Sequence, residues 1–352
     1  MPRTHHFTVL DSFRGLAALA IVILHAPWLA GGGPELFRLS EPFVLFFFVL
    51  SGFVLFHAHG RRPTGATAFG RFVATRGFRI LPLHLCLLGL ILLLDFTLPD
   101  AGPNLLANLL LLQAWLPDAE GLSMNPAADG LGIGFYLSLL FGLALLTLPR
   151  GREGACLLLA ILALWGLLGG VDGLGRSLLL GVGGFCLGAL SCALHHQLRL
   201  LPLGPGAFTL LEVTVLALLA LILDSAYAHR ELYAIALAAL ALFIFAFEGG
   251  LVSRLLDRGP LRSLGRWAFA IYLGHLAVFL ALATLIPLLF GDGRPALLDS
   301  LLAPIAVLLV IALAALLHHG VERPGVALGR RLLAPRARAR TAQAVKVSRA
   351  SG

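Results

Sequence analysis

The sequence predicts an all-α membrane protein, a polytopic bundle of about ten transmembrane helices with both termini in the cytoplasm. Of its 352 residues, 59% are hydrophobic and only 12% are charged. Long apolar stretches recur from residue 15 to residue 317 with few interruptions. Helices and closed barrels are the structures that satisfy every backbone polar group inside a bilayer, and stretches of this length are typical of helices.

The expected spans follow from allotting roughly 17 to 25 residues to each crossing. A shorter apolar piece at 104–115 is expected to be re-entrant or interfacial. The ten spans lie near residues 10–30, 42–59, 79–98, 132–148, 155–172, 177–194, 209–224, 230–247, 266–290 and 298–319.

Basic residues give an independent test of this topology, because short cytoplasmic loops collect Lys and Arg. With the N-terminus inside, only four of the 26 basic residues fall on the outer side. These four are Arg38, Arg176, Arg230 and Arg294. A wrong helix count would scatter the basic residues over both sides, so the distribution favours ten spans.

We expect one transmembrane domain over 1–333 and a disordered basic tail over 334–352. The tail is rich in Arg and small residues and is typical of segments that lie against anionic lipid. The net charge of +8 does not indicate nucleic-acid binding, because the Arg residues lie at helix ends and in the tail. The lipid bilayer is therefore an expected partner and nucleic acid is not.

The first expected span holds the strongest candidate site, Arg14 and His25 within LDSFRGLAALAIVILHAPW. A cation and an imidazole inside a hydrophobic span are costly, so they mark a functional site by default. At 1.5 Å per residue, the two lie roughly 16 Å apart along a helix axis.

Arg76 and Arg79 are a second candidate site, in the inner segment RFVATRGFRILP. Their i, i+3 spacing places both on one helix face. Guanidinium groups so placed can bind a phosphate or a carboxylate bidentately. The segment is equally compatible with a plain marker of the cytoplasmic side.

No metal site and no bound cofactor is expected. All cysteines fall inside expected spans without metal-type spacing and are interpreted as small core residues. Most histidines cluster at helix ends, where interfacial positions explain them. The cysteines are Cys86, Cys156, Cys186 and Cys192, and the histidines are His57, His59, His84, His195, His196, His318 and His319.

Five segments in order resemble the acyltransferase-3 family of integral membrane acyltransferases, nearly end to end. Each segment alone is a weak signal, and their order and depth in the topology make the resemblance strong. They are Arg14 with His25, Ser51-Gly52-Phe53 in FFFVLSGFVLF, Arg76 with Arg79 and Pro82, Tyr272 with His275 in IYLGHL, and Glu322-Arg323-Pro324. One departure is NPAADGLGIG before Phe135-Tyr136, where the family usually carries Trp-Ser-x-x-x-Glu and where Asp129 is the nearby carboxylate.

The resemblance implies transfer of an acyl group, often acetyl, from cytoplasmic acyl-coenzyme A to a hydroxyl of a cell-surface or lipid-linked glycan. Acyl-coenzyme A is thus the expected co-substrate, and a bacterial cytoplasmic membrane the expected location. His25 is the expected general base, and Arg14, Arg76 and Arg79 are expected to bind the coenzyme phosphates. The expected supporting residues are Asp11, Ser51, Tyr272, His275 and Glu322.

Alternatives stay open at this stage. A transporter or flippase of an anionic or lipid-linked solute would use the same Arg cluster and buried His, and an acyltransferase could act on a small-molecule acceptor. A member of the family without activity is a further alternative. Ser51 could form an acyl-enzyme through His25, although Ser-Gly pairs are commoner at helix contacts in membranes.

Overall fold

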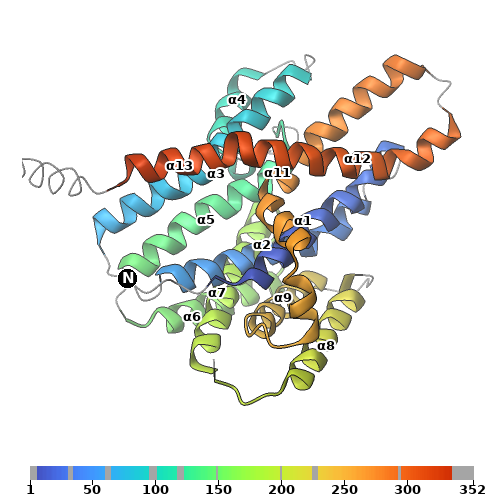
Figure 1. Ribbon diagram of the computed structural model, residues 1–352. Coiled ribbons are helices and arrows are strands. Elements are labelled where there is room, and N and C mark those ends of the chain that lie inside the picture. The colour runs from blue at the N-terminus through green and yellow to red at the C-terminus, as the bar shows by residue number, and fades with distance from the viewer. Residues whose placement is uncertain are drawn as a thin grey trace, which may run out of the picture.

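A computed structural model describes residues 6–30, 35–59, 65–94, 101–116, 123–147, 150–198, 200–223, 229–291 and 295–334 (Figure 1). Within these ranges the regular structure is entirely helical. The expected basic tail lies almost wholly outside the described residues, since it is described only at Ala334.

The helices that build the bundle are named by their order along the chain. They are α1 Thr8–His25, α2 Glu35–His59, α3 Ala66–Leu94, α4 Ala101–Leu109, α5 Ala127–Thr147, α6 Arg152–Leu168, α7 Gly173–Leu198, α8 Pro205–Leu223, α9 Arg230–Phe245, α10 Leu251–Leu256, α11 Gly259–Phe290, α12 Ala296–Leu317 and α13 Arg323–Leu332. Short helical turns are η1 Ala26–Ala30, η2 Gln113–Trp115 and the π turn η3 His318–Glu322.

Eight helical stretches among the described residues are long and apolar enough to cross a membrane. They correspond to eight of the ten expected spans. The other two expected spans coincide with α6 and α9, which have 17 and 16 residues. Those lengths lie at or just below the shortest usual crossing. The count of ten and the cytoplasmic termini therefore stay predictions.

Helix directions favour counting α6 as a crossing. Gly166 and Gly183 lie against Leu179 and Ala163, respectively, so α6 and α7 form an antiparallel pair. In contrast, α7 runs parallel to α2, because Gly184 lies against Phe48 and His196 against His57. Successive crossings alternate in direction. If α6 crosses the membrane, α7 is the sixth crossing and must run in the same direction as α2, the second crossing. The structure shows this parallel arrangement.

Helix α1 lies between two hydrophobic cores and contributes to both. One core joins α2 with α6, α7 and α9, and receives Val9 and Ala17 from α1. The other joins α3, α11 and α12, and receives Ala18 and Val22. Neighbouring residues of α1 thus face opposite halves of the bundle, which makes it a central helix of the fold (Figure 1).

Helices α1 and α11 pack backbone to backbone in parallel register. A Cβ at Gly15 would collide with the backbone of Gly265, and one at Gly265 would collide with Asp11. Ten residues further along each helix, His25 meets His275. Because the offset is the same on both helices, they run in the same direction through this contact.

Helices α12 and α13 form one continuous rod through the π turn η3, seen in red in Figure 1. Gly325 and Gly329 of α13 let it approach α3 closely, where they meet Pro82 and Phe78. A π turn inside a helix is frequent at functional sites. Here it brings Glu322 into the bundle, where its side chain is buried.

Candidate active site

Two histidines from opposite parts of the chain meet inside the bundle. His25 is the last residue of α1, and His275 lies in the middle of α11, with exposed fractions of 8% and 0%. The His25 Nδ1 and His275 Nε2 atoms are 3.0 Å apart. The other nitrogen of His25, Nε2, lies 2.8 Å from the hydroxyl oxygen of Ser40, which is also buried.

The hydrogen bonds of this group determine which nitrogen carries each proton. His275 Nδ1 lies 2.6 Å from the carbonyl oxygen of Tyr272, which can only accept, so His275 Nδ1 must donate. In the neutral ring, His275 Nε2 is then an acceptor and receives the proton of His25 Nδ1. Neutral His25 is left with Nε2 as an acceptor that points at the Ser40 hydroxyl. In the neutral pair, Nε2 is thus the proton-accepting nitrogen of His25.

Ser40 was not predicted from the sequence, in which Ser51 was the serine considered as a possible nucleophile beside His25, as an alternative to direct transfer. Ser51 lies eleven residues beyond Ser40 on α2, or about 16 Å along the helix axis. Its neighbour Gly52 instead packs against the backbone of Phe185, as expected of a Ser-Gly pair at a helix contact. No sequence motif marks Ser40; its proximity follows only from how α1 and α2 are joined.

Arg14 is held near the opposite end of the α1–α11 contact. Its guanidinium donates to the carbonyl oxygen of Gly265 at 2.6 and 3.2 Å and lies 3.3 Å from the Asp11 carboxylate. The charges of Arg79 and Glu322 also act on Arg14. The structure therefore brings Arg14, Asp11, Arg79 and Glu322 into one electrostatic neighbourhood.

Arg76 and Arg79 extend this neighbourhood along α3. They lie one turn apart, and the charge of Arg79 acts on Arg76. Among the described residues, neither has a carboxylate within 4 Å, and the buried Nε of Arg76 has no hydrogen-bond partner. A cluster with more cations than anions is suited to bind phosphate groups.

Glu322 is shared between two partners. Its carboxylate lies 2.9 Å from His318 Nδ1 within the π turn, and its charge acts on Arg14. Glu322 lies between α12 and α13, more than 300 residues after Arg14 in the sequence. The C-terminal helices therefore contribute a charged group to the surroundings of Arg14.

The carboxylate of Asp129 lies beside Tyr272, one turn before His275. Ser123 donates to Asp129 at 2.6 Å, and the charge of Asp129 acts on Tyr272. A Cβ at Gly130 would lie 3.0 Å from the Tyr272 hydroxyl, so α5 and α11 are in close contact here. The stretch that departs from the expected Trp-Ser-x-x-x-Glu element thus supplies a carboxylate of its own that acts on Tyr272.

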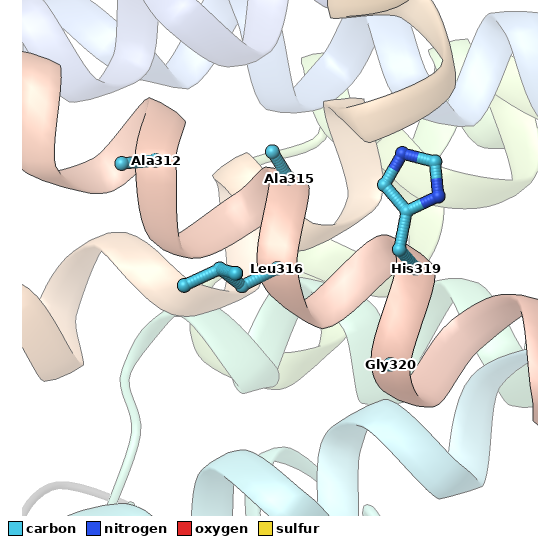
Figure 2. Close-up of a pocket in the computed structure, with 5 residues that line it drawn as sticks. All are labelled: Ala312, Ala315, Leu316, His319 and Gly320. Atoms are coloured by element: carbon cyan, nitrogen blue, oxygen red, sulfur yellow. The ribbon is translucent and has the colours of Figure 1, made fainter.

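A surface depression of about 650 Å³ on α12 and η3 is separate from these residues. Figure 2 shows its lining, with Ala315 and His319 pointing to the same side of the helix. The lining is mostly apolar and includes Leu316, which is 71% exposed. It contains none of the candidate site residues.

The chain is similar to known proteins over most of its length. The family model described as "Acyltransferase domain", of the acyltransferase-3 type, matches residues 7–319. The chain is also 42% identical over 85 residues to a protein described as "Protein 2 in picA locus" from Rhizobium radiobacter. That match covers 24% of this chain and 43% of the relative. No solved structure matches. Because the family model covers most of the chain, the protein belongs to the acyltransferase-3 family.

Proposed function

We propose that this multi-pass membrane acyltransferase is an O-acyltransferase with His25 as its general base. It would move an acyl group, in the simplest case acetyl, from cytoplasmic acyl-coenzyme A to a hydroxyl of a cell-surface or lipid-linked glycan. The observation that carries the proposal is the hydrogen-bonded series from Tyr272 through His275 to His25, which makes Nε2 the proton-accepting nitrogen of neutral His25.

The reaction is a direct transfer in two steps. His25 Nε2 takes the proton of the acceptor hydroxyl as its oxygen attacks the thioester carbon, which forms a tetrahedral intermediate. The intermediate then collapses, the carbon–sulfur bond breaks, and the coenzyme thiolate receives the proton from His25. Coenzyme A leaves as the free thiol and the acceptor leaves as an ester. His275 acts as a positioning residue, because it fixes the tautomer of His25.

The proposed donor site lies at the other end of α1. Arg14, Arg76 and Arg79 would hold the phosphates of the coenzyme, and the unpartnered Nε of Arg76 supports this assignment. Arg14 and His25 are separated by about 16 Å along the helix axis. The pantetheine arm is of comparable length, so phosphates bound at Arg14 would let the thioester reach His25.

The proposed acceptor enters from the outer side, beside Tyr272 and Asp129. The longest outer loop of the expected topology, residues 99–131, contains no Lys or Arg, which suits a neutral sugar better than an anionic solute. Asp129 and Tyr272 offer a carboxylate and a hydroxyl, the groups that commonly orient sugar hydroxyls. A small-molecule acceptor would use the same groups and is distinguished by the product.

The test measures two products in isolated membranes. Thiol release from radiolabelled acetyl-coenzyme A and transfer of label into envelope glycan are followed for wild type, His25→Ala and His84→Ala. His84 is the matched control, because it is a buried histidine of α3 that bonds the Asn108 carbonyl instead of His25. Protein amounts in the membrane are equalised by immunoblot.

We expect wild type and His84→Ala to release thiol and transfer label, and His25→Ala to do neither. Thiol release with label in a small soluble product would keep the chemistry and replace the glycan acceptor. Binding of the labelled donor without thiol release by any variant would instead support a carrier. Equal transfer by His25→Ala and wild type would remove His25 as the base.

A further inference from the structure

Three metal-ligating side chains meet at one end of the α2–α7 pair, away from the proposed active site. The ligand atoms of His57, Cys192 and His196 all lie within 4.8 Å of one another. His57 Nδ1 is 3.1 Å from His196 Nε2, and Cys192 Sγ is 3.8 Å from the same nitrogen. Cys192 is fully buried, and both histidines are half-buried.

Two of these separations are close to those that a tetrahedral ion requires. Zinc binds imidazole nitrogen at about 2.0 to 2.1 Å and thiolate sulfur at about 2.3 Å, so tetrahedral angles place two nitrogens about 3.4 Å apart and nitrogen and sulfur about 3.6 Å apart. The observed 3.1 and 3.8 Å are each within a few tenths of an ångström of these values. One sulfur and two imidazole nitrogens favour zinc over a hard cation such as magnesium.

The backbone holds the three ligands in place. Cys192 and His196 are i and i+4 on α7, so they share one helix face. The same face carries Gly184 and Gly188, and a Cβ at Gly188 would collide with the backbone of α2. This close contact fixes the register of the two helices. His57 of α2 is therefore placed beside the last turns of α7 by packing that does not depend on its own side chain.

We propose that His57 Nδ1, Cys192 Sγ and His196 Nε2 form a zinc site that joins α2 to α7, with water as the fourth ligand. Binding would release the thiol proton of Cys192 to solvent. The proton between the two imidazoles would move to the other nitrogen of its own ring, so that each neutral ring offers a lone pair to the ion. His57 lies 17 residues beyond Ser40 on α2, or about 25 Å along its axis. The site is thus distinct from the histidine pair and is assigned a structural role, in which the ion clamps the cytoplasmic ends of the two helices.

Cobalt is the probe, because a thiolate bound to Co²⁺ gives a charge-transfer absorption that binding through nitrogen or oxygen alone does not. Full-length protein is purified in detergent with a tag that contains no histidine, then stripped with chelator and titrated with Co²⁺. Cys192→Ser removes the sulfur ligand, and Cys186→Ser is the matched control, a buried cysteine on the same helix. A third variant, His57→Cys, keeps three ligands while changing one.

We expect wild type, Cys186→Ser and His57→Cys to bind one equivalent of Co²⁺ and to show the thiolate charge-transfer band. Zn²⁺ should displace the bound Co²⁺, whereas excess Mg²⁺ should not. Cys192→Ser is expected to lose the band. A wild-type protein without the band would overturn the proposal regardless of how the variants fold. An unchanged band in Cys192→Ser, eluting as a single peak on size exclusion, would overturn it as well.

Discussion

Gly15 of α1 lies directly against Gly265 of α11, and the absence of side chains at both positions lets the two backbones touch. This contact sets the register that places His25 against His275 ten residues further on. It also exposes the Gly265 carbonyl oxygen to the guanidinium of Arg14. One glycine pair thus positions both ends of the candidate site.

Replacing Gly265 with Ala should separate α1 from α11, since the new methyl group would collide with the backbone of Asp11. Overpacking of this kind costs about 1 to 3 kcal/mol. We expect a lower midpoint of thermal unfolding in detergent and a loss of acyl transfer. Gly259→Ala on the same helix is the control, because a Cβ there meets nothing within 4 Å. Equal midpoints for the two variants would contradict this account.

Substitutions of His275 should distinguish a positioning role from packing. His275→Gln keeps an acceptor oxygen near the place of Nε2, whereas His275→Leu removes it and leaves His25 free to adopt the other tautomer. General-base catalysis contributes about 10²- to 10⁴-fold to rate. We therefore expect kcat to fall by about that factor in the Leu variant and to recover in part in the Gln variant. The KM for acyl-coenzyme A should be the same in both, and equal kcat values would argue for packing alone.

Ser40→Ala should separate direct transfer from an acyl-enzyme. In direct transfer the acceptor hydroxyl replaces that of Ser40 at His25 Nε2, so the variant should keep most of the wild-type rate. Mass spectrometry of wild type incubated with acetyl-coenzyme A alone should find Ser40 unmodified. An acetylated Ser40 peptide, together with loss of transfer in the Ala variant, would show that Ser40 is the nucleophile.

Arg76→Gln should weaken donor binding, because it removes a cation that has no carboxylate partner among the described residues. A hydrogen bond to a charged group contributes about 1.5 to 3 kcal/mol, so the KM for acetyl-coenzyme A should rise by about 10- to 100-fold. Arg71→Gln on the same helix is the control, since Arg71 is exposed. Acetyl-pantetheine lacks the nucleotide phosphates, so its KM should be unchanged. A parallel rise for that substrate would place Arg76 elsewhere than at the phosphates.

Asp257 should make stability depend on pH at the junction between α10 and α11. It accepts hydrogen bonds from Arg262 and Thr8, and the bond from Arg262 lowers the pKa of Asp257 below its usual value. A lowered pKa means that the ionised form stabilises the fold above about pH 3.9, the unfolded value. This contribution is lost as pH falls through the folded pKa. The Tm difference between wild type and Asp257→Asn should therefore be present at pH 7 and vanish in acid.

The sequence predicted the membrane class and most helices because apolar segments of the right length are rare outside bilayers. α6 and α9 are the exceptions, since short crossings depend on neighbouring helices that a hydropathy pattern does not include. For α6, helix direction adds a second observation: the parallel contact of Gly184 with α2 favours an even crossing number for α7, and α6 supplies the crossing that this needs. The status of α9 stays a prediction.

The site was predicted in part, and the missing part has a physical reason. Charged and imidazole groups inside apolar spans are conspicuous in a sequence, so Arg14, His25 and His275 were found. Ser40 and Asp129 are ordinary polar residues near helix ends, and only three-dimensional packing places them beside His25 and Tyr272. Cys192 and His196 were interpreted separately, as a core residue and an interfacial residue. The sequence does not show that the packing of α2 against α7 places His57 beside both of them.

The bond between His25 and His275 joins residues that are 250 positions apart in the chain. During synthesis at about 5 to 20 residues per second, α11 would leave the ribosome about 10 to 50 s after α1. For that interval Arg14 lacks the Gly265 carbonyl and His25 lacks its histidine partner. The contact between α1 and α11 can therefore form only after nearly four-fifths of the sequence has been made, and a chain truncated before α11 would carry His25 without the histidine that orients it.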